Sequence, residues 1–201
     1  LFTTDLFLAS AQDGKILRKL FSQAPEGHID QLNSLESAGT WSPDSRRFAF
    51  PAFKRGRSVL VIKDVETGKT QRELQFANLP YFIQPAWSPD GKSIVVTGTH
   101  RGQTDLYLID LKTKKATRLT ENSASEIHPE WSPDGKILAF STDAPAWQQG
   151  QGSGYWPFSL ALLDPSDRSI RYPTQFDGAN HFNPQYDASG NLLFLSDRNG
   201  A

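Results

Sequence analysis

Few residues of this chain lie in motifs typical of catalytic, metal-binding or phosphate-binding sites. The sequence contains no cysteine, and its histidines include no i, i+4 pair that could bind a metal from one helix face. The nearest approach to the G-x-S-x-G motif of serine hydrolases is Gly152-Ser153-Gly154, with no helical pattern after it. The glycines from Gly150 onward also lack the Lys-Ser/Thr pair of a phosphate-binding loop. We therefore predict no catalytic residue, no metal site and no cofactor.

A short repeated phrase dominates the sequence instead. An aromatic residue followed by Ser-Pro-Asp recurs about every 45 residues. The aromatic positions are Trp41, Trp87, Trp131 and, in a copy that has lost the Trp and the Pro, Tyr186. In Ser-Pro-Asp-Gly the proline presets φ, the Asp side chain caps the turn, and the glycine allows a positive φ. We predict that these aspartates form turns and that the tryptophans pack between sheets.

Short apolar strands follow each copy of the phrase. The first strands after the phrase are predicted at 47–50, 93–96, 137–140 and 192–195, and the second at 59–62, 106–109 and 160–163. More polar third strands follow at 70–74, 116–119 and 169–172. No helical pattern of useful length separates these segments. The sequence therefore predicts an all-β fold, a β-propeller of four-stranded antiparallel blades.

The repeats predict three complete blades and two half-blades within a single propeller region, 1–201. The half-blades are 1–22 and 181–197, and the blades are 36–79, 82–124 and 126–176, the last with an insertion at 144–157. We expect an arc of a ring with six or more blades. The alternative is that the half-blades join across the termini and close a four-bladed ring. The sequence has no methionine, even at position 1, so we expect it to be a piece of a longer protein.

The repeat carries a family resemblance. The segment from Trp131 to Phe140, and Asp105-Leu-Tyr-Leu-Ile-Asp110 in the blade before it, resemble the WD-like repeat of TolB-like propellers. Such repeats build periplasmic and cell-envelope proteins and also the N-terminal propellers of prolyl-oligopeptidase-type serine peptidases. The resemblance covers nearly the whole chain. It implies the fold strongly and the function weakly, because one fold hosts many functions.

One polar position recurs before the repeat aromatic. Gln84, His128 and Asn183 each precede a proline in the first strand of a blade. First strands line the central channel of a propeller, so these residues should gather at one mouth of the channel. They are either polar groups solvated in a wet channel or contacts for a ligand, an ion or a peptide.

The insertion at 144–157 is rich in aromatic residues. It contains Trp147, Tyr155 and Trp156. Exposed Trp and Tyr side chains often anchor protein interfaces. The alternative is that these rings fold back onto their own blade.

The amino-acid composition indicates which classes of partner the chain could bind. Lys and Arg (21) nearly balance Asp and Glu (22), so nothing favours nucleic acid, and no apolar run is long enough to span a membrane. We expect a protein or peptide partner, and the resemblance implies a periplasmic or envelope location. The leading hypothesis is a non-catalytic, protein-binding scaffold propeller. The alternative is the substrate-gating propeller of a serine peptidase whose catalytic domain lies outside this chain.

Overall fold

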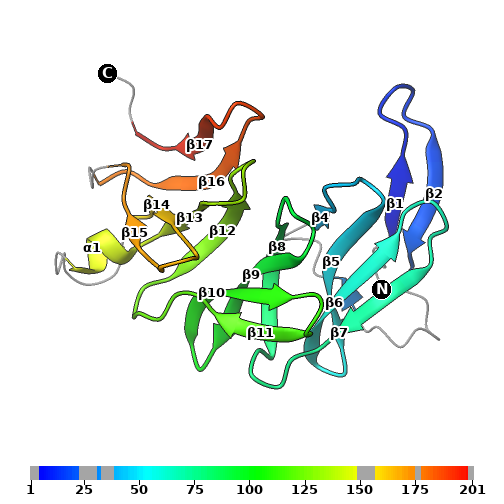
Figure 1. The fold of residues 1–201 in the computed structure, drawn as a ribbon, viewed down its shortest axis with the longest axis horizontal. Coiled ribbons are helices and arrows are strands. Elements are labelled where there is room, and N and C mark those ends of the chain that lie inside the picture. The colour runs from blue at the N-terminus through cyan, green and yellow to red at the C-terminus, as the bar shows by residue number, and fades with distance from the viewer. Residues whose placement is uncertain (1–4, 23–30, 33–38, 149–156, 175–177, 199–201) are drawn as a thin grey trace.

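The chain folds into a succession of antiparallel sheets that form an open arc (Figure 1). The computed structural model describes residues 5–22, 31–32, 39–148, 157–174 and 178–198. In these residues the regular structure is almost entirely strand, with one short helix. The predicted all-β class and the four-stranded blades are confirmed.

The first complete sheet follows an N-terminal hairpin. Its strands are β3 (Gln31–Leu32), β4 (Thr40–Trp41), β5 (Arg47–Lys54), β6 (Arg57–Asp64) and β7 (Thr70–Leu74). Both β3 and β4 pair with the edge of β5 that faces away from β6, so they form two parts of one inner strand. The sheet is therefore four strands wide, and β3 adds residues that precede position 36, where the sequence predicts this blade to begin.

The second and third sheets repeat the same plan. The second contains β8 (Tyr81–Trp87), β9 (Ser93–His100), β10 (Gln103–Asp110) and β11 (Lys115–Arg118). The third contains β12 (Glu126–Trp131), β13 (Leu138–Thr142), β14 (Ser159–Leu163) and β15 (Ile170–Arg171). In both sheets each strand pairs with the next one along the chain. Short turns are therefore enough to build a blade.

A two-stranded sheet stands at each end of the arc. They are β1 (Leu6–Ala9) with β2 (Ile16–Phe21), and β16 (His181–Tyr186) with β17 (Leu192–Ser196). The two sheets lie apart and do not pair with each other (Figure 1). The ring is thus open, which confirms the predicted arc and makes the alternative of a closed four-bladed ring wrong.

The repeated phrase forms the turn that leads out of each first strand. The Ser88 hydroxyl donates a hydrogen bond to Asp90 Oδ1 at 2.7 Å, and this oxygen also accepts the Lys92 N–H at 3.0 Å. These bonds, that from Ser88 above all, lower the pKa of Asp90. Gly91 has a φ of 72°, and Ser45 takes the equivalent place in the first copy with a φ of 56°. The turn role predicted for these aspartates is confirmed.

The apolar core lies between neighbouring sheets. One cluster of buried residues contains both Leu60 of the first blade and Ile94 of the second. Another contains Leu106 of the second blade and Phe140 of the third. Because each cluster draws on two sheets, no blade has a complete core of its own.

The insertion in the third blade contains a helix that sequence patterns did not predict. Helix α1 (Ala144–Gln148) is only five residues long. Its start is capped by Thr142 Oγ1, which accepts the Ala144 N–H at 3.1 Å, and Pro145 follows in the first turn. A helix this short has no apolar periodicity to detect.

Replacing a ring in the core between blades should destabilise the fold strongly. Phe140 is 1% exposed, and we expect Phe140→Ala to lower the free energy of unfolding by about 3–5 kcal/mol through the cavity it leaves. The matched change Phe7→Ala, at a ring that is 46% exposed, should cost less than about 1 kcal/mol. Urea titration followed by circular dichroism measures both. Equal losses would contradict a core located between the sheets.

Candidate functional site: a cavity on the inner side of the arc

The first strands of successive sheets lie beside one another. β8 contacts β4 on one side and β12 on the other, and β12 also contacts β16. These strands form the inner side of the arc, and the remaining strands of each sheet extend away from it (Figure 1). Side chains at the ends of the first strands are therefore brought together from four repeats.

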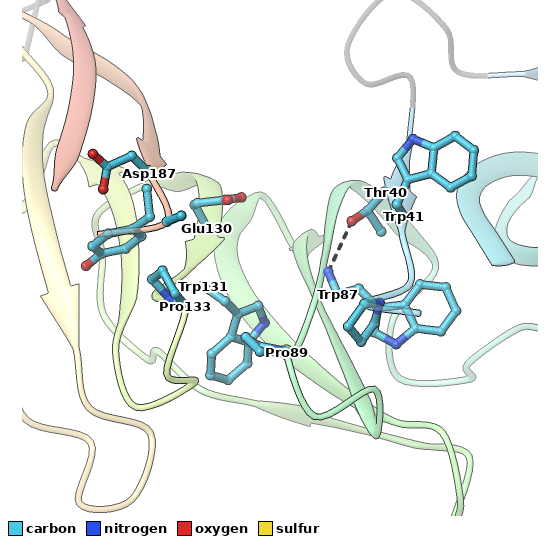
Figure 2. Close-up of a pocket in the computed structure, with 11 residues that line it drawn as sticks. Thr40, Trp41, Trp87, Pro89, Glu130, Trp131, Pro133 and Asp187 are labelled. Atoms are coloured by element: carbon cyan, nitrogen blue, oxygen red, sulfur yellow. Dashed lines mark hydrogen bonds between the residues drawn. The ribbon is translucent and has the colours of Figure 1, made fainter. Parts of the chain in front are cut away.

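A cavity of about 370 Å³, here called the axial cavity, lies where these first strands end. Its lining comes mainly from equivalent positions of the repeat: the aromatic residue at the end of each first strand and the residue two places later. The full lining is Thr40, Trp41, Pro43, Trp87, Pro89, Glu130, Trp131, Pro133, Tyr186, Asp187 and Ala188 (Figure 2). Since four repeats contribute, the cavity exists only when the blades pack side by side.

Two of the repeat tryptophans join neighbouring blades. Trp131 Nε1 donates a hydrogen bond to the Ala86 carbonyl of the blade before it, at 3.2 Å. The Trp87 backbone N–H donates to Thr40 Oγ1 at 3.3 Å, as Figure 2 shows. The Arg47 guanidinium lies over the Trp87 ring, 5.0 Å from its centroid. The predicted packing between sheets is confirmed for Trp87 and Trp131.

For Trp41 the predicted packing between sheets is wrong. Its side chain is 46% exposed, although it makes an edge contact with Phe48 at 5.2 Å between ring centroids. Figure 2 shows this ring at the edge of the group of residues that line the axial cavity. An indole that is exposed beside a cavity is available to a partner, whereas an indole between blades is not.

Glu130 brings a carboxyl group into the axial cavity (Figure 2). Burial raises the pKa of this carboxyl to about 7. Among the residues that the structure describes, nothing donates a hydrogen bond to it or pairs with it as a cation. No lysine or arginine is part of the described lining. Glu130 is therefore a poorly solvated acid that has no counter-ion in the described part of the chain.

The residues predicted to gather at a channel mouth lie on the same first strands, at equivalent bulges. Gln84, His128 and Asn183 have positive φ angles of 51°, 56° and 54°. At each of them the pairing of the first strand with the second shifts register. A bulge inserts an extra residue and redirects its side chain. The repeat thus builds the same irregularity three times.

The contacts of these three residues differ. Gln84 Oε1 accepts hydrogen bonds from Thr97 Oγ1 and from the His128 backbone N–H, each at 2.9 Å. His128 packs edge-on against Phe182, its Nδ1 is buried without a described partner, and burial lowers its pKa. Asn183 is exposed. The structure therefore joins Gln84 to His128 and leaves Asn183 open to solvent.

A second group of acids lies at the joint between the second and third blades. Asp105 is fully buried and pairs with Arg118 at 2.6 Å. Glu126 is 1% exposed and accepts a hydrogen bond from Thr120 Oγ1 at 3.1 Å, and burial raises its pKa to about 7. No group of three or more acidic or histidine side chains in the described part of the chain is placed to hold a metal ion. We assign these acids to the joint between the blades.

The aromatic insertion gives no geometry for an interface. The backbone of Trp147 belongs to α1, but its side chain lies outside what the structure describes. Tyr155 and Trp156 also lie outside the described residues. These three candidates stay predictions.

Glu130 and the cavity around it were missed by sequence reasoning. Glu130 occupies the position just before the repeat aromatic, where the other repeats carry Thr40, Ala86 and Gln185. It is the only charged residue among these four, and that difference was the available signal. Whether a cation lies near Glu130 depends on how the neighbouring blades pack. The sequence difference alone therefore could not identify Glu130 as an unpaired acid.

The sequence matches a known family of propeller domains. A family model described as the TolB β-propeller domain matches residues 27–154. The chain belongs to the TolB β-propeller family. No curated protein matches this TolB-family chain. In the described residues, no helix has the length and apolar character needed to cross a membrane.

Solved structures resemble the TolB-family chain over nearly all its length. The TolB structure from Acinetobacter baumannii is 21% identical with a TM-score of 0.72, over 98% of this chain and 44% of that one. A putative TolB from Agrobacterium tumefaciens is 25% identical with a TM-score of 0.75, over 96% and 62%. This chain therefore spans less than two thirds of either protein.

Propellers of peptidases share the fold as well. A structure from a study of two prolyl endopeptidases is 17% identical with a TM-score of 0.63, over 94% of this chain and 28% of that one. At this identity the likeness concerns the fold alone.

The hydrogen bond between the second and third blades should have a measurable effect on stability. Trp131→Phe removes the indole donor to the Ala86 carbonyl, and we expect a loss of about 0.5–1.5 kcal/mol in the free energy of unfolding. Trp41→Phe makes the same chemical change at an exposed ring and should cost less. Urea titration compares the two variants. A larger loss for Trp41→Phe would contradict the role assigned to Trp131.

The raised pKa of Glu130 should make stability depend on pH. Folding shifts this pKa from an ordinary 4.5 to about 7, so the folded chain binds more protons than the unfolded chain in that range. Stability therefore falls as pH rises through the range. Glu130→Gln lacks this titration, so its free energy of unfolding relative to the wild type should rise from pH 4.5 to about 7 and then level off. Urea titrations at several pH values test this. A flat difference would contradict it.

Proposed function

We propose that this chain is a non-catalytic, protein-binding scaffold propeller of a bacterial periplasmic or cell-envelope protein, and that a polypeptide partner binds at the axial cavity. The observation that carries the proposal is the repeated lining of this cavity. Four successive repeats each contribute an aromatic residue to its lining. Tyr and Trp are among the residues that contribute most to binding energy at protein interfaces.

The rim of the cavity supports recognition through side chains. Pro43, Pro89 and Pro133 stand at equivalent places in the lining. Proline has no backbone N–H and a fixed φ, so these three residues restrict the backbone and offer no N–H to a partner strand. The exposed indole of Trp41 beside it offers apolar area with a single donor. A partner would insert side chains here instead of adding a strand.

We propose further partner contacts at the residues that the sequence predicted for the channel mouth and for the aromatic insertion. The polar group of Asn183 is exposed on the same first strands, and Gln84 and His128 occupy equivalent bulges. We propose that a long partner segment reaches this row from the axial cavity. We also propose that Trp147, Tyr155 and Trp156 belong to a second contact surface in the insertion.

The location and the scaffold role rest on the family. The chain matches the TolB propeller model over most of its length, and the resemblance of its repeat to periplasmic and envelope propellers supports placement there. The nearly balanced charge, a net −1, is compatible with a protein partner and gives no electrostatic support for binding nucleic acid.

A second function is the gating of substrates for a serine peptidase. The fold shared with the prolyl endopeptidase structure, at a TM-score of 0.63, supports it. In this case a catalytic domain outside this chain would carry a G-x-S-x-G pentad followed by Asp and His. Sequencing the parent gene beyond this segment distinguishes the two proposals.

A variant that fills the axial cavity should test the proposed function. Ala188 lies in the lining at the place where other repeats have proline. Peptides selected from a displayed library on the wild-type chain should bind Ala188→Phe at least ten-fold more weakly, because the added ring takes up the volume that the ligand needs. Fluorescence anisotropy with labelled peptides measures the affinities.

The matched control is Ala11→Phe, at an exposed position in the turn between β1 and β2. It adds the same ring far from the cavity along the chain and should leave the affinities unchanged. If the selected peptides bind Ala188→Phe as tightly as they bind the wild type, the axial cavity is not the binding site.

A further inference from the structure

The residues that line the axial cavity include acids but no basic residue, and the nearby Arg47 guanidinium lies over the Trp87 ring and pairs with Asp44. Glu130 and Asp187 are the ionisable carboxylates of the described lining, which contains no lysine or arginine. The Glu130 carboxyl is shielded from water enough for its pKa to reach about 7. Removing a carboxylate from water is costly unless a cation or several donors compensate. A cation that enters the cavity would supply this missing compensation.

Asp187 also brings a carboxylate to the lining, and this carboxylate is held by hydrogen bonds within its own turn. Its Oδ1 accepts the backbone N–H groups of Ser189 and Asn191, each at 2.8 Å, and its Oδ2 accepts Asn191 Nδ2 at 2.8 Å. These bonds, led by those from Asn191, lower the pKa of Asp187. Asp187 therefore stays ionised and adds a negative field, while Glu130 is available as the direct counter-ion.

The walls of the cavity suit an organic cation. Trp41, Trp131 and Tyr186 are aromatic residues of the lining, and the faces of aromatic rings attract ammonium and guanidinium groups. The chain itself contains this interaction, since the Arg47 guanidinium lies 5.0 Å from the centroid of the Trp87 ring. Rings and carboxylate together favour a basic side chain over a hydrated metal ion, which would need several oxygen ligands.

The cavity is large enough for a side chain of a partner. Its volume of about 370 Å³ is near the lower end of the range for small-molecule sites, about 300–1,000 Å³. A long side chain fits this space. The rest of a partner chain would lie across the proline rim.

We propose that the axial cavity holds one arginine or lysine side chain of the partner polypeptide, with Glu130 as its counter-ion and the repeat aromatics as its walls. This inference rests on the proposed function and names the chemistry by which the partner is recognised. The cation replaces the proton on Glu130, so binding releases that proton when the acid starts out protonated.

Two peptides that differ only in charge test the inference. The probes are Ac-Gly-Ser-Arg-Ser-Gly-NH2 and the same peptide with citrulline, a neutral analogue of arginine. Each is titrated into the ¹⁵N-labelled chain at about pH 8, and the indole N–H signals are followed by NMR. We expect the arginine peptide to bind at least ten-fold more tightly and to shift the Trp131 indole signal. Equal affinities for the two peptides would overturn the proposal.

Variants assign the preference to Glu130. Glu130→Gln should abolish the difference between the two peptides, and Glu130→Asp, which retains the charge, should restore part of it. The control Glu66→Gln makes the same change at an exposed position and should keep the full preference. Retention of the preference in Glu130→Gln, with its indole spectrum intact, would sink the assignment.

The pH profile separates a counter-ion from a structural residue. The charged or titratable groups of the surrounding strands and turns are Tyr186, Asp187, Asp134, Arg171, His128 and Glu126, together with Arg47 over the Trp87 ring and its partner Asp44. Of these, Glu126 also titrates near pH 7, but it is present in every variant. The affinity for arginine peptide should rise from about pH 6 to 8 in the wild type and stay level in Glu130→Gln. Matching profiles would overturn the role of Glu130.

Free ethylguanidinium tests whether the cavity prefers an arginine within a polypeptide over a free small cation. It should bind at least ten-fold more weakly than the arginine peptide, because it makes no contact with the rim. Equal binding would overturn the assignment to a polypeptide.

If Ala188→Phe blocks the selected peptides while arginine and citrulline peptides bind alike, this inference fails and the proposed function stands. If Ala188→Phe blocks nothing, the proposed function fails.

Discussion

Each sheet of this chain has to bury its apolar faces against the next sheet, and this requirement organises the rest of the structure. The buried clusters all draw on adjacent sheets, as Leu106 and Phe140 show for the second and third blades. Where a neighbouring sheet is lacking, apolar side chains remain in solvent: Leu195 in the last hairpin is 64% exposed, and Ile16 in the first is 62% exposed. Stability is therefore distributed over the contacts between blades, as in other repeat proteins.

The same packing builds the candidate site. When sheets stack with their first strands inward, one position of the repeat is presented again by each blade around a common axis. Trp131 thus has two roles, because its indole bonds to the blade before it and its ring also lines the axial cavity. A residue that holds two blades together cannot vary freely. In the binding role that we propose, specificity would come from lining positions that do not join blades, and Glu130 is an acidic position of this kind with no described partner.

Much of the fold could be predicted because its signals are local. The polar groups of the Ser-Pro-Asp turn form hydrogen bonds within a few residues, as between Ser88 and Asp90. The spacing of this turn therefore predicted where the strands on either side of it lie. The bulges at Gln84 and His128 were visible only as a polar residue before proline, and their backbone conformation was not. Helix α1 was missed because five residues are too few for periodicity. None of these omissions changed the fold class.

The sequence by itself determined the strands, the turns and their repetition, since each depends on interactions between near neighbours in the chain. It also contained every side chain of the axial cavity, but it could not show that they meet. The raised pKa of Glu130 comes from burial, and burial is a property of the blades around it. The same is true of the exposure that separates Trp41 from Trp87. Only the tertiary structure decided these features, because desolvation and burial depend on residues that lie about one or more repeats away in the chain.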